Sequence, residues 1–219
     1  MRTANCVCVL ALASCSGLAS AGLVTSFGFT ELSASFDIGT GEFMAEASSA
    51  NGLSTTGDVT GYGAGVETVV FNPGFYTGGT DAYVLITMSI VNVVGNTAFA
   101  EGGRFLIRDA DGDNLAGSFE GQWNLRFGFA FFDGEITSAQ FNDAGDGIFE
   151  GPGGGSFDTP EGTLIGALSF LMMESTGSLF SDSFEARPAS VDGMLVVPAP
   201  GALTLAGIGG LVLARRRRG

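Results

Sequence analysis

Apolar side chains occur at every second position in several segments of this chain. Three runs have this spacing: Val84, Ile86, Met88 and Ile90; Trp123, Leu125, Phe127, Phe129 and Phe131; and Leu164, Gly166, Leu168, Phe170 and Met172. A period of two is that of a β-strand with one buried face. No window of residues 22–195 keeps an apolar period of 3.6 long enough for a core helix. The alternation therefore predicts an all-β domain.

Turn signals divide the chain into many short segments. Glycine accounts for 36 of the 219 residues and phenylalanine for 19, and the apolar runs are broken by Asn72-Pro73-Gly74, by residues 78–81 and by residues 151–155. Asp133-Gly134 is a two-residue turn signal that would fold residues 135–141 back as a hairpin. Short strands joined by such turns are typical of antiparallel sheets. We expect an antiparallel β-sandwich, with a small closed antiparallel β-barrel as the alternative.

The N-terminus has the organisation of a secretory signal peptide. Met1-Arg2 supplies the positive charge, residues 6–18 are largely apolar, and Ala19-Ser20-Ala21 is a small-residue cleavage site. Residues 1–21 are therefore predicted to be removed. An alternative is lipoprotein processing at Cys15, because residues 12–15 resemble a lipobox. Both interpretations predict that the domain is exported.

The C-terminus has the organisation of a membrane-crossing segment. No charge occurs from Met194 to Ala214, which is about the ~20 residues that a helix needs to cross a bilayer. A basic cluster then follows, and such clusters stay on the cytoplasmic side. It consists of Arg215, Arg216, Arg217 and Arg218. We assign residues 196–219 to this tail and residues 22–195 to the exported domain, with residues 185–192 as the linker between them.

The tail also carries a proline motif directly before the apolar segment. The motif is Val197-Pro198-Ala199-Pro200, and Gly207, Gly209 and Gly210 interrupt the apolar run. Together with the arginine cluster, these residues resemble the PEP-CTERM sorting signal, although alanine stands where that family usually has glutamate. The resemblance implies an exosortase-type processing enzyme as partner, delivery to the cell surface or extracellular matrix, and association with extracellular polysaccharide. A plain single-pass tail anchor is the alternative.

The composition of the domain excludes several classes of function. All three cysteines lie in the predicted signal peptide, and residues 22–195 hold four arginines against 23 acids, a net charge of −19. Such a charge repels nucleic acid. The chain has no histidine or lysine, so catalytic triads and Schiff-base chemistry are excluded, and zinc sites are not expected. We expect a non-catalytic protein. The alternative is a glycoside hydrolase that uses a pair of carboxylates.

One acidic stretch has the spacing of metal ligands. Asp109, Asp111, Asp113 and Glu120 occupy positions one, three, five and twelve of a calcium-loop pattern, but Asn114 replaces the glycine at position six. The flanking residues have strand character, which argues against an EF-hand. The sequence thus predicts weak Ca²⁺ binding by these four side chains, with a solvated acidic turn as the alternative.

Overall fold

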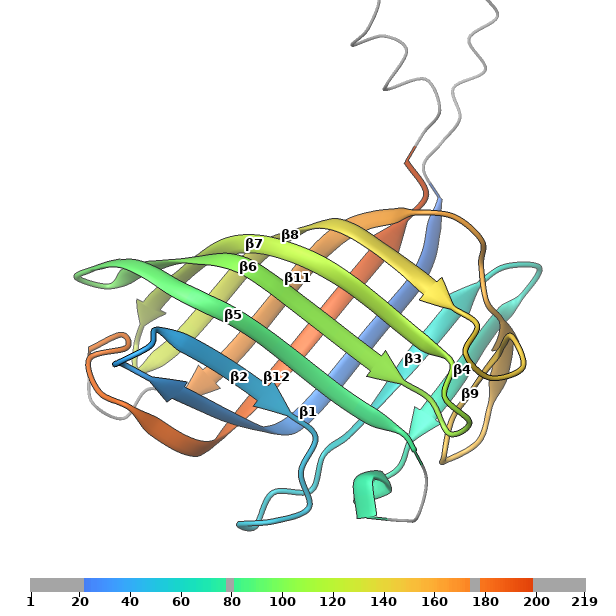
Figure 1. Cartoon of the computed structure of the whole chain (residues 1–219), viewed down its shortest axis with the longest axis horizontal. Coiled ribbons are helices and arrows are strands. Elements are labelled where there is room, and N and C mark those ends of the chain that lie inside the picture. The colour runs from blue at the N-terminus through green and yellow to red at the C-terminus, as the bar shows by residue number, and fades with distance from the viewer. Residues whose placement is uncertain (1–21, 78–80, 174–177, 199–219) are drawn as a thin grey trace, which may run out of the picture. The chain divides into compact units, whose positions relative to one another are not determined.

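The computed structural model describes residues 22–77, 81–173 and 178–198 (Figure 1). These residues form twelve β-strands and one short 3₁₀ turn, η1 (Phe75–Thr77), with no α-helix among them, so the all-β prediction is confirmed. No helix in these ranges is long and apolar enough to span a membrane. The predicted signal peptide and most of the predicted tail lie outside the described residues.

The strands form a closed antiparallel barrel with additional strands beside it. In chain order they are β1 (Leu23–Asp37), β2 (Glu42–Glu46), β3 (Thr56–Tyr62), β4 (Val66–Phe71), β5 (Tyr83–Val94), β6 (Thr97–Arg108), β7 (Asn114–Arg126), β8 (Phe129–Asn142), β9 (Ile148–Glu150), β10 (Ser156–Asp158), β11 (Leu164–Met173) and β12 (Phe184–Val196). The large sheet has the order β12-β11-β8-β7-β6-β5-β2-β1-β3-β4, and β12 also pairs with β1. This last pairing closes eight strands into a barrel.

The favoured sandwich prediction is therefore wrong, and the barrel alternative is confirmed. The two folds share the same strand alternation and turn signals, and they differ in whether the terminal strands of the sheet pair with each other. Here β1 pairs with β12 from Leu23↔Val196 to Phe36↔Phe184. The buried face of the sheet thus packs against itself rather than against a second sheet.

Strand β1 changes partners halfway along its length. Its first half pairs with β3 from Thr25 to Thr30, and its second half pairs with β2 from Ser33 to Asp37. Between the two halves, Glu31 has a positive φ of 56° and the register with β12 shifts, which indicates a β-bulge. At this point the β3–β4 hairpin separates from the barrel wall (Figure 1).

Strand β12 includes the segment that we predicted to be a linker. Residues 185–192 lie within β12, and the strand pairs with β1 on one side and with β11 on the other. Val191 and Leu195 are buried. The linker prediction failed because charged residues and a proline interrupt the apolar alternation of this segment: Glu185, Pro188 and Asp192 are exposed, and Arg187 packs over the ring of Phe184. The strand ends at Val196, directly before the proline motif.

The hairpin predicted at Asp133-Gly134 is also misplaced. Strand β8 continues through both residues, and the turn lies at Phe127-Gly128, where φ is 54° and 80°. Two consecutive positive φ angles are characteristic of a type I′ hairpin turn. As a result, Trp123 and Leu125 point into the barrel, whereas Phe129 and Phe131 point outward. A phenylalanine in a left-handed conformation is uncommon, which is why the sequence favoured the Asp-Gly pair.

Aromatic rings fill the interior of the barrel. Trp123 is fully buried, and its ring centroid lies 5.3–5.9 Å from the centroids of Phe132, Phe170 and Phe180 and 5.4 Å from that of Phe43. The indole N–H of Trp123 donates to the sulfur of Met88 at 3.4 Å. Burying side chains of this size is the largest favourable contribution to the stability of the fold.

Several of the rings lie over a glycine on a neighbouring strand. Directly paired examples are Phe29↔Gly57, Phe27↔Gly193, Phe119↔Gly103 and Phe105↔Gly117. A Cβ atom on any of these four glycines would overlap atoms of the paired ring. The Phe132 ring covers Gly121 and Gly134 in the same way. A side chain at any of these six positions would displace a ring, so the packing of the phenylalanines requires glycine there.

Substitution of one of these glycines should destabilise the barrel. We expect Gly193→Ala to lower the free energy of unfolding by about 1–3 kcal/mol, because the added methyl group meets the Phe27 ring. Gly63→Ala is the control, since nothing lies within 4 Å of the position of its Cβ, and its effect should stay within about 0.5 kcal/mol. Denaturant unfolding of both variants measures the difference. Equal stabilities would show that the ring does not lie over Gly193.

Candidate functional site

The predicted metal-binding loop lies between β6 and β7. Asp109 and Asp113 are completely buried and Asp111 is exposed, and the three side chains offer ligand oxygens within 4.8 Å of one another. Oxygen ligands of Ca²⁺ lie at 2.3–2.6 Å from the ion, so two ligands of one ion are at most about 5 Å apart. Three of the four predicted ligands thus lie close enough together to bind a single ion.

The fourth predicted ligand, Glu120, is not part of this cluster. It lies within strand β7, six residues beyond Asn114, where that strand begins. A strand rises by about 3.3 Å per residue, which places Glu120 roughly 20 Å farther along the sheet. It is opposite Glu135 on β8. The calcium-loop spacing failed here because position twelve returns to the ion only when the chain curls back, and this chain is extended.

Backbone N–H groups already bind the two buried carboxylates. Oδ1 of Asp109 accepts hydrogen bonds from the N–H groups of Asp111 and Gly112 at 3.2 and 2.9 Å, and its Oδ2 accepts one from Glu150 at 2.9 Å. Asp113 accepts from Gly145 at 2.5 Å and from Gly147 at 2.7 Å. The bonds from Gly145, Gly147 and Glu150 join the β6–β7 turn to the β8–β9 loop and to β9. The two aspartates therefore have a structural role whether or not a cation binds.

The pKa of Asp109 is raised to about 6, chiefly because the carboxyl group is buried and also because Asp111 lies beside it, although the hydrogen bonds from the Glu150 and Gly112 N–H groups lower it. The ordinary value for the unfolded chain is 3.8. The neutral form of Asp109 thus adds stability below pH 3.8, and this contribution is lost as the pH rises through about 6. At neutral pH the fold holds a buried negative charge, which a cation would stabilise.

A second acidic region lies on the outer face of the barrel. Its residues are paired across five neighbouring strands. They are, in order across the sheet, Asp58 on β3, Gly28 on β1, Asp192 on β12, Ser169 on β11 and Asp133 on β8. These residues line an open groove of about 590 Å³. Partial burial raises the pKa of Asp58, and the nearby Asp192 carboxylate raises it further. Gly28 on β1 lies between Asp58 and Asp192. Because it has no side chain, it leaves space for the two carboxylates to approach each other.

Glu120, which was predicted as a metal ligand, instead lines a neighbouring groove. Glu101, Glu120, Asp133 and Glu135 line this open groove of about 600 Å³, together with Phe99, whose side chain is exposed. Neither groove could be predicted from the sequence. The acidic residues of each groove come from three different strands. Each is flanked by non-acidic residues within its strand, so no local spacing in the sequence could have predicted a groove.

The predicted sorting residues lie at the edge of the described part of the chain or beyond it. Val197 is exposed and follows the end of β12, and Pro198 is the last described residue. Ala199, Pro200 and Arg215, Arg216, Arg217 and Arg218 lie outside the described residues, as do Ala19 and Ala21. The first strand begins at Leu23, which pairs with Val196. The two ends of the barrel domain are therefore adjacent.

No family model, no curated protein and no solved structure matches this chain.

We propose that the Asp109–Asp113 loop binds calcium weakly. At neutral pH and fixed ionic strength, calcium at ten times its Kd should stabilise the fold by about 1.4 kcal/mol, which raises the unfolding midpoint by a few degrees. Asp111→Asn should remove this response, because Asp111 is the exposed member of the cluster.

Glu120→Gln is the matched control for this experiment. It removes the same charge from β7 and should leave the calcium response unchanged. A response that persists in Asp111→Asn, or no response at several millimolar calcium, would identify the loop as an acidic turn only.

Proposed function

We propose that the protein is an exported, non-catalytic cell-surface or matrix protein, delivered by a PEP-CTERM-type sorting signal. The observation that carries the proposal is the sequence of the tail: a proline motif, an uncharged apolar segment and four arginines. The barrel supports it because β12 ends at Val196, so the motif begins directly where the paired strand stops.

The pairing of the two terminal strands also supports this proposal. Leu23 lies two residues after the predicted signal cleavage site, and its partner Val196 lies two residues before Pro198. A signal peptide and a membrane-crossing tail would therefore leave the barrel at the same end.

The filled interior supports a non-catalytic role. Rings of Trp123, Phe132, Phe170 and Phe180 occupy the space that a ligand would take in an open barrel. The function is therefore expected on the outer face, where association with extracellular polysaccharide would take place.

Mass spectrometry of the protein from its native cells tests the sorting proposal. The mature chain should begin near Gly22 and end within or shortly after residues 197–200, and replacement of both Pro198 and Pro200 by alanine should leave a full-length, membrane-bound form. The N-terminal mass serves as an internal control for export. Mature protein that still contains Arg215–Arg218 would contradict the proposal and favour the plain tail anchor.

The alternative, a glycoside hydrolase delivered by the same signal, is supported by the Asp58–Asp192 groove. Glycosidases use two carboxyl groups, one of them with a raised pKa, and burial and the nearby Asp192 raise the pKa of Asp58. The test is release of reducing sugar from a polysaccharide. An activity of the wild type that is lost in both Asp58→Asn and Asp192→Asn would support this alternative. Activity unaffected by these changes, or absent in the wild type, would exclude this groove as the active site.

A further inference from the structure

Exposed apolar side chains gather on the outer face of β8 and β11, next to the β7–β8 turn. In the register of these two strands Phe131 pairs with Leu171 and Phe129 with Met173, and the ring centroids of Phe129 and Phe131 are 6.3 Å apart. The four side chains are 38–64% exposed, whereas the residues that alternate with them along both strands are buried. All four therefore share one face. Together with Phe127 at the turn, they form what we call the β8–β11 patch.

Phe127 is unusual both in its exposure and in its backbone conformation. Its side chain is 99% exposed, and its φ is 54°. Left-handed backbone is unfavourable for a bulky residue, and asparagine or glycine normally occupies this position of a type I′ turn. Because the surface of Phe127 is almost entirely uncovered, packing within the fold does not offset this strain. A strained residue kept at a fully exposed position points to a contact outside the fold.

The patch is large for an apolar surface that faces water. Taking roughly 200 Å² for one phenylalanine side chain, the exposed fractions of Phe127, Phe129 and Phe131 correspond to about 350 Å², and Leu171 and Met173 enlarge this area. The largest apolar patch of a typical monomer covers about 300–600 Å² and is often functional. Two copies packed through the patch would together bury about 1,000 Å², which is the size that a specific interface has to reach.

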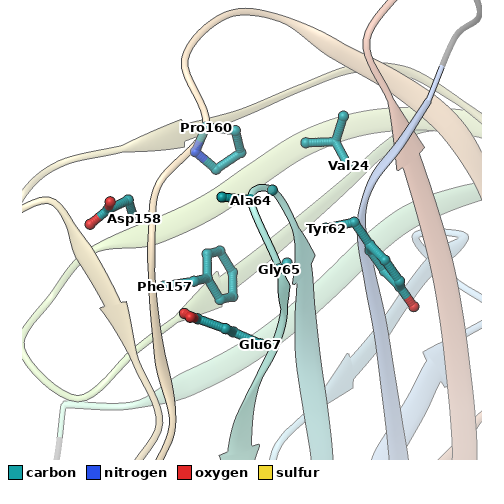
Figure 2. A pocket seen from close by; sticks show the side chains of 10 residues that line it. Val24, Tyr62, Ala64, Gly65, Glu67, Phe157, Asp158 and Pro160 are labelled. Carbon is teal, nitrogen blue, oxygen red and sulfur yellow. The ribbon is translucent and has the colours of Figure 1, made fainter.

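The five residues of the patch carry no charge, unlike other surfaces of this acidic domain. Carboxylates line both grooves on the outer face. Two more, those of Glu67 and Asp158, belong to a hollow of about 170 Å³ beside the β3–β4 hairpin (Figure 2). Because residues 22–195 have a net charge of −19, two copies repel each other at such surfaces. The β8–β11 patch is a surface through which they can approach.

The patch lies at the end of the barrel opposite to the pairing of Leu23 with Val196. Strand β11 runs from Ile165, which pairs with Val196, to Met173, which pairs with Phe129. At about 3.3 Å per residue, this part of the strand is about 26 Å long. In Figure 1 the β7–β8 turn accordingly lies at the left end of the barrel, whereas β12 ends at the upper right. A molecule bound on the patch would leave Leu23 and Val196 uncovered.

A lipid surface and a second copy are the two partners whose chemistry suits an apolar patch. Segments that lie in a membrane interface carry lysine and arginine beside their apolar residues. Strands β7, β8 and β11 together have one basic residue, Arg126, which pairs with Phe129 at one end of the patch. At the other end, Asp133 follows two residues after Phe131. Charges of opposite sign at the two ends favour a second copy, because a twofold axis brings Arg126 of each copy toward Asp133 of the other.

We propose that the β8–β11 patch is a self-association surface, on which a second copy of this chain packs through the same residues. Phe129 of one copy lies over Phe131 of the other, the two Phe127 rings are covered at the edges of the contact, and Arg126 pairs with Asp133 of the second copy at the polar rim. The inference goes beyond the proposed function and does not depend on how the tail is processed.

Sedimentation velocity of the mature protein, purified from the cells that export it, tests this proposal. The wild type should convert reversibly from monomer to dimer as its concentration rises through the micromolar range. Phe127→Asn should weaken the dimer at least tenfold. Because asparagine accepts the left-handed conformation more readily than phenylalanine, the unfolding midpoint of this variant should equal or exceed that of the wild type. Loss of the dimer would then not reflect loss of the fold.

Val66→Thr is the matched control, because it removes another exposed apolar side chain, on the β3–β4 hairpin. It should change the dimer affinity less than twofold. The charge pair provides a second test that a merely sticky surface would not pass. Arg126→Asp and Asp133→Arg should each weaken the dimer severalfold, and the two changes together should restore it.

Several results would overturn the proposal: a monomer at every concentration, a dimer that Phe127→Asn leaves unchanged, an equal loss in Val66→Thr, or a charge-exchanged double variant as weak as the single ones. A protein that stays monomeric but binds phosphatidylcholine vesicles through Phe127 would identify a lipid surface as the partner instead. None of these results would change the mature C-terminus found by mass spectrometry. Failure of this inference is thus distinguishable from failure of the sorting proposal.

Discussion

Phenylalanine rings that pack over glycines of adjacent strands are the contact on which the barrel depends. An eight-stranded barrel has an interior just wide enough for side chains to fill it. Rings at Phe27, Phe29, Phe105 and Phe119 fill it because the residue opposite each has no side chain. The same packing fills the interior of the barrel with buried side chains.

Closure of the barrel links this packing to the ends of the chain. Strand β1 must pair with β12 for the interior to be covered, and the pairing of Leu23 with Val196 brings the predicted signal cleavage site and the predicted sorting motif to one end. The two ends of the described domain therefore lie side by side.

The parts of the fold that could be predicted from the sequence are the strands with one uninterrupted buried face. Val84, Ile86, Met88 and Ile90 are all buried on β5, and Leu164, Leu168, Phe170 and Met172 are buried on β11. The turn between β7 and β8 could not be predicted, because Phe127 adopts a conformation that its residue type disfavours. Strand β12 was missed because its charged residues obscure the alternation.

Barrel closure and the acidic grooves depend on long-range pairing, which leaves no local signal in the sequence. Strand spacing alone is compatible with a sandwich, and Asp58, Asp133 and Asp192 meet only because their three strands lie close together in the sheet. The metal-ligand spacing was informative for Asp109, Asp111 and Asp113, which belong to one turn. It failed for Glu120 because that residue belongs to an extended strand.

Cross-strand backbone NOEs, measured by NMR on the mature protein, test the closed barrel most directly. The pairing predicts contacts from β1 to β12, such as Ala34 to Arg187, together with contacts from β1 to β2, such as Ser35 to Met44. NOEs on both sides of β1 along its second half would demonstrate that the sheet closes. A spectrum in which β1 or β12 lacks these contacts and forms the free edge of one of two separate sheets would contradict the barrel.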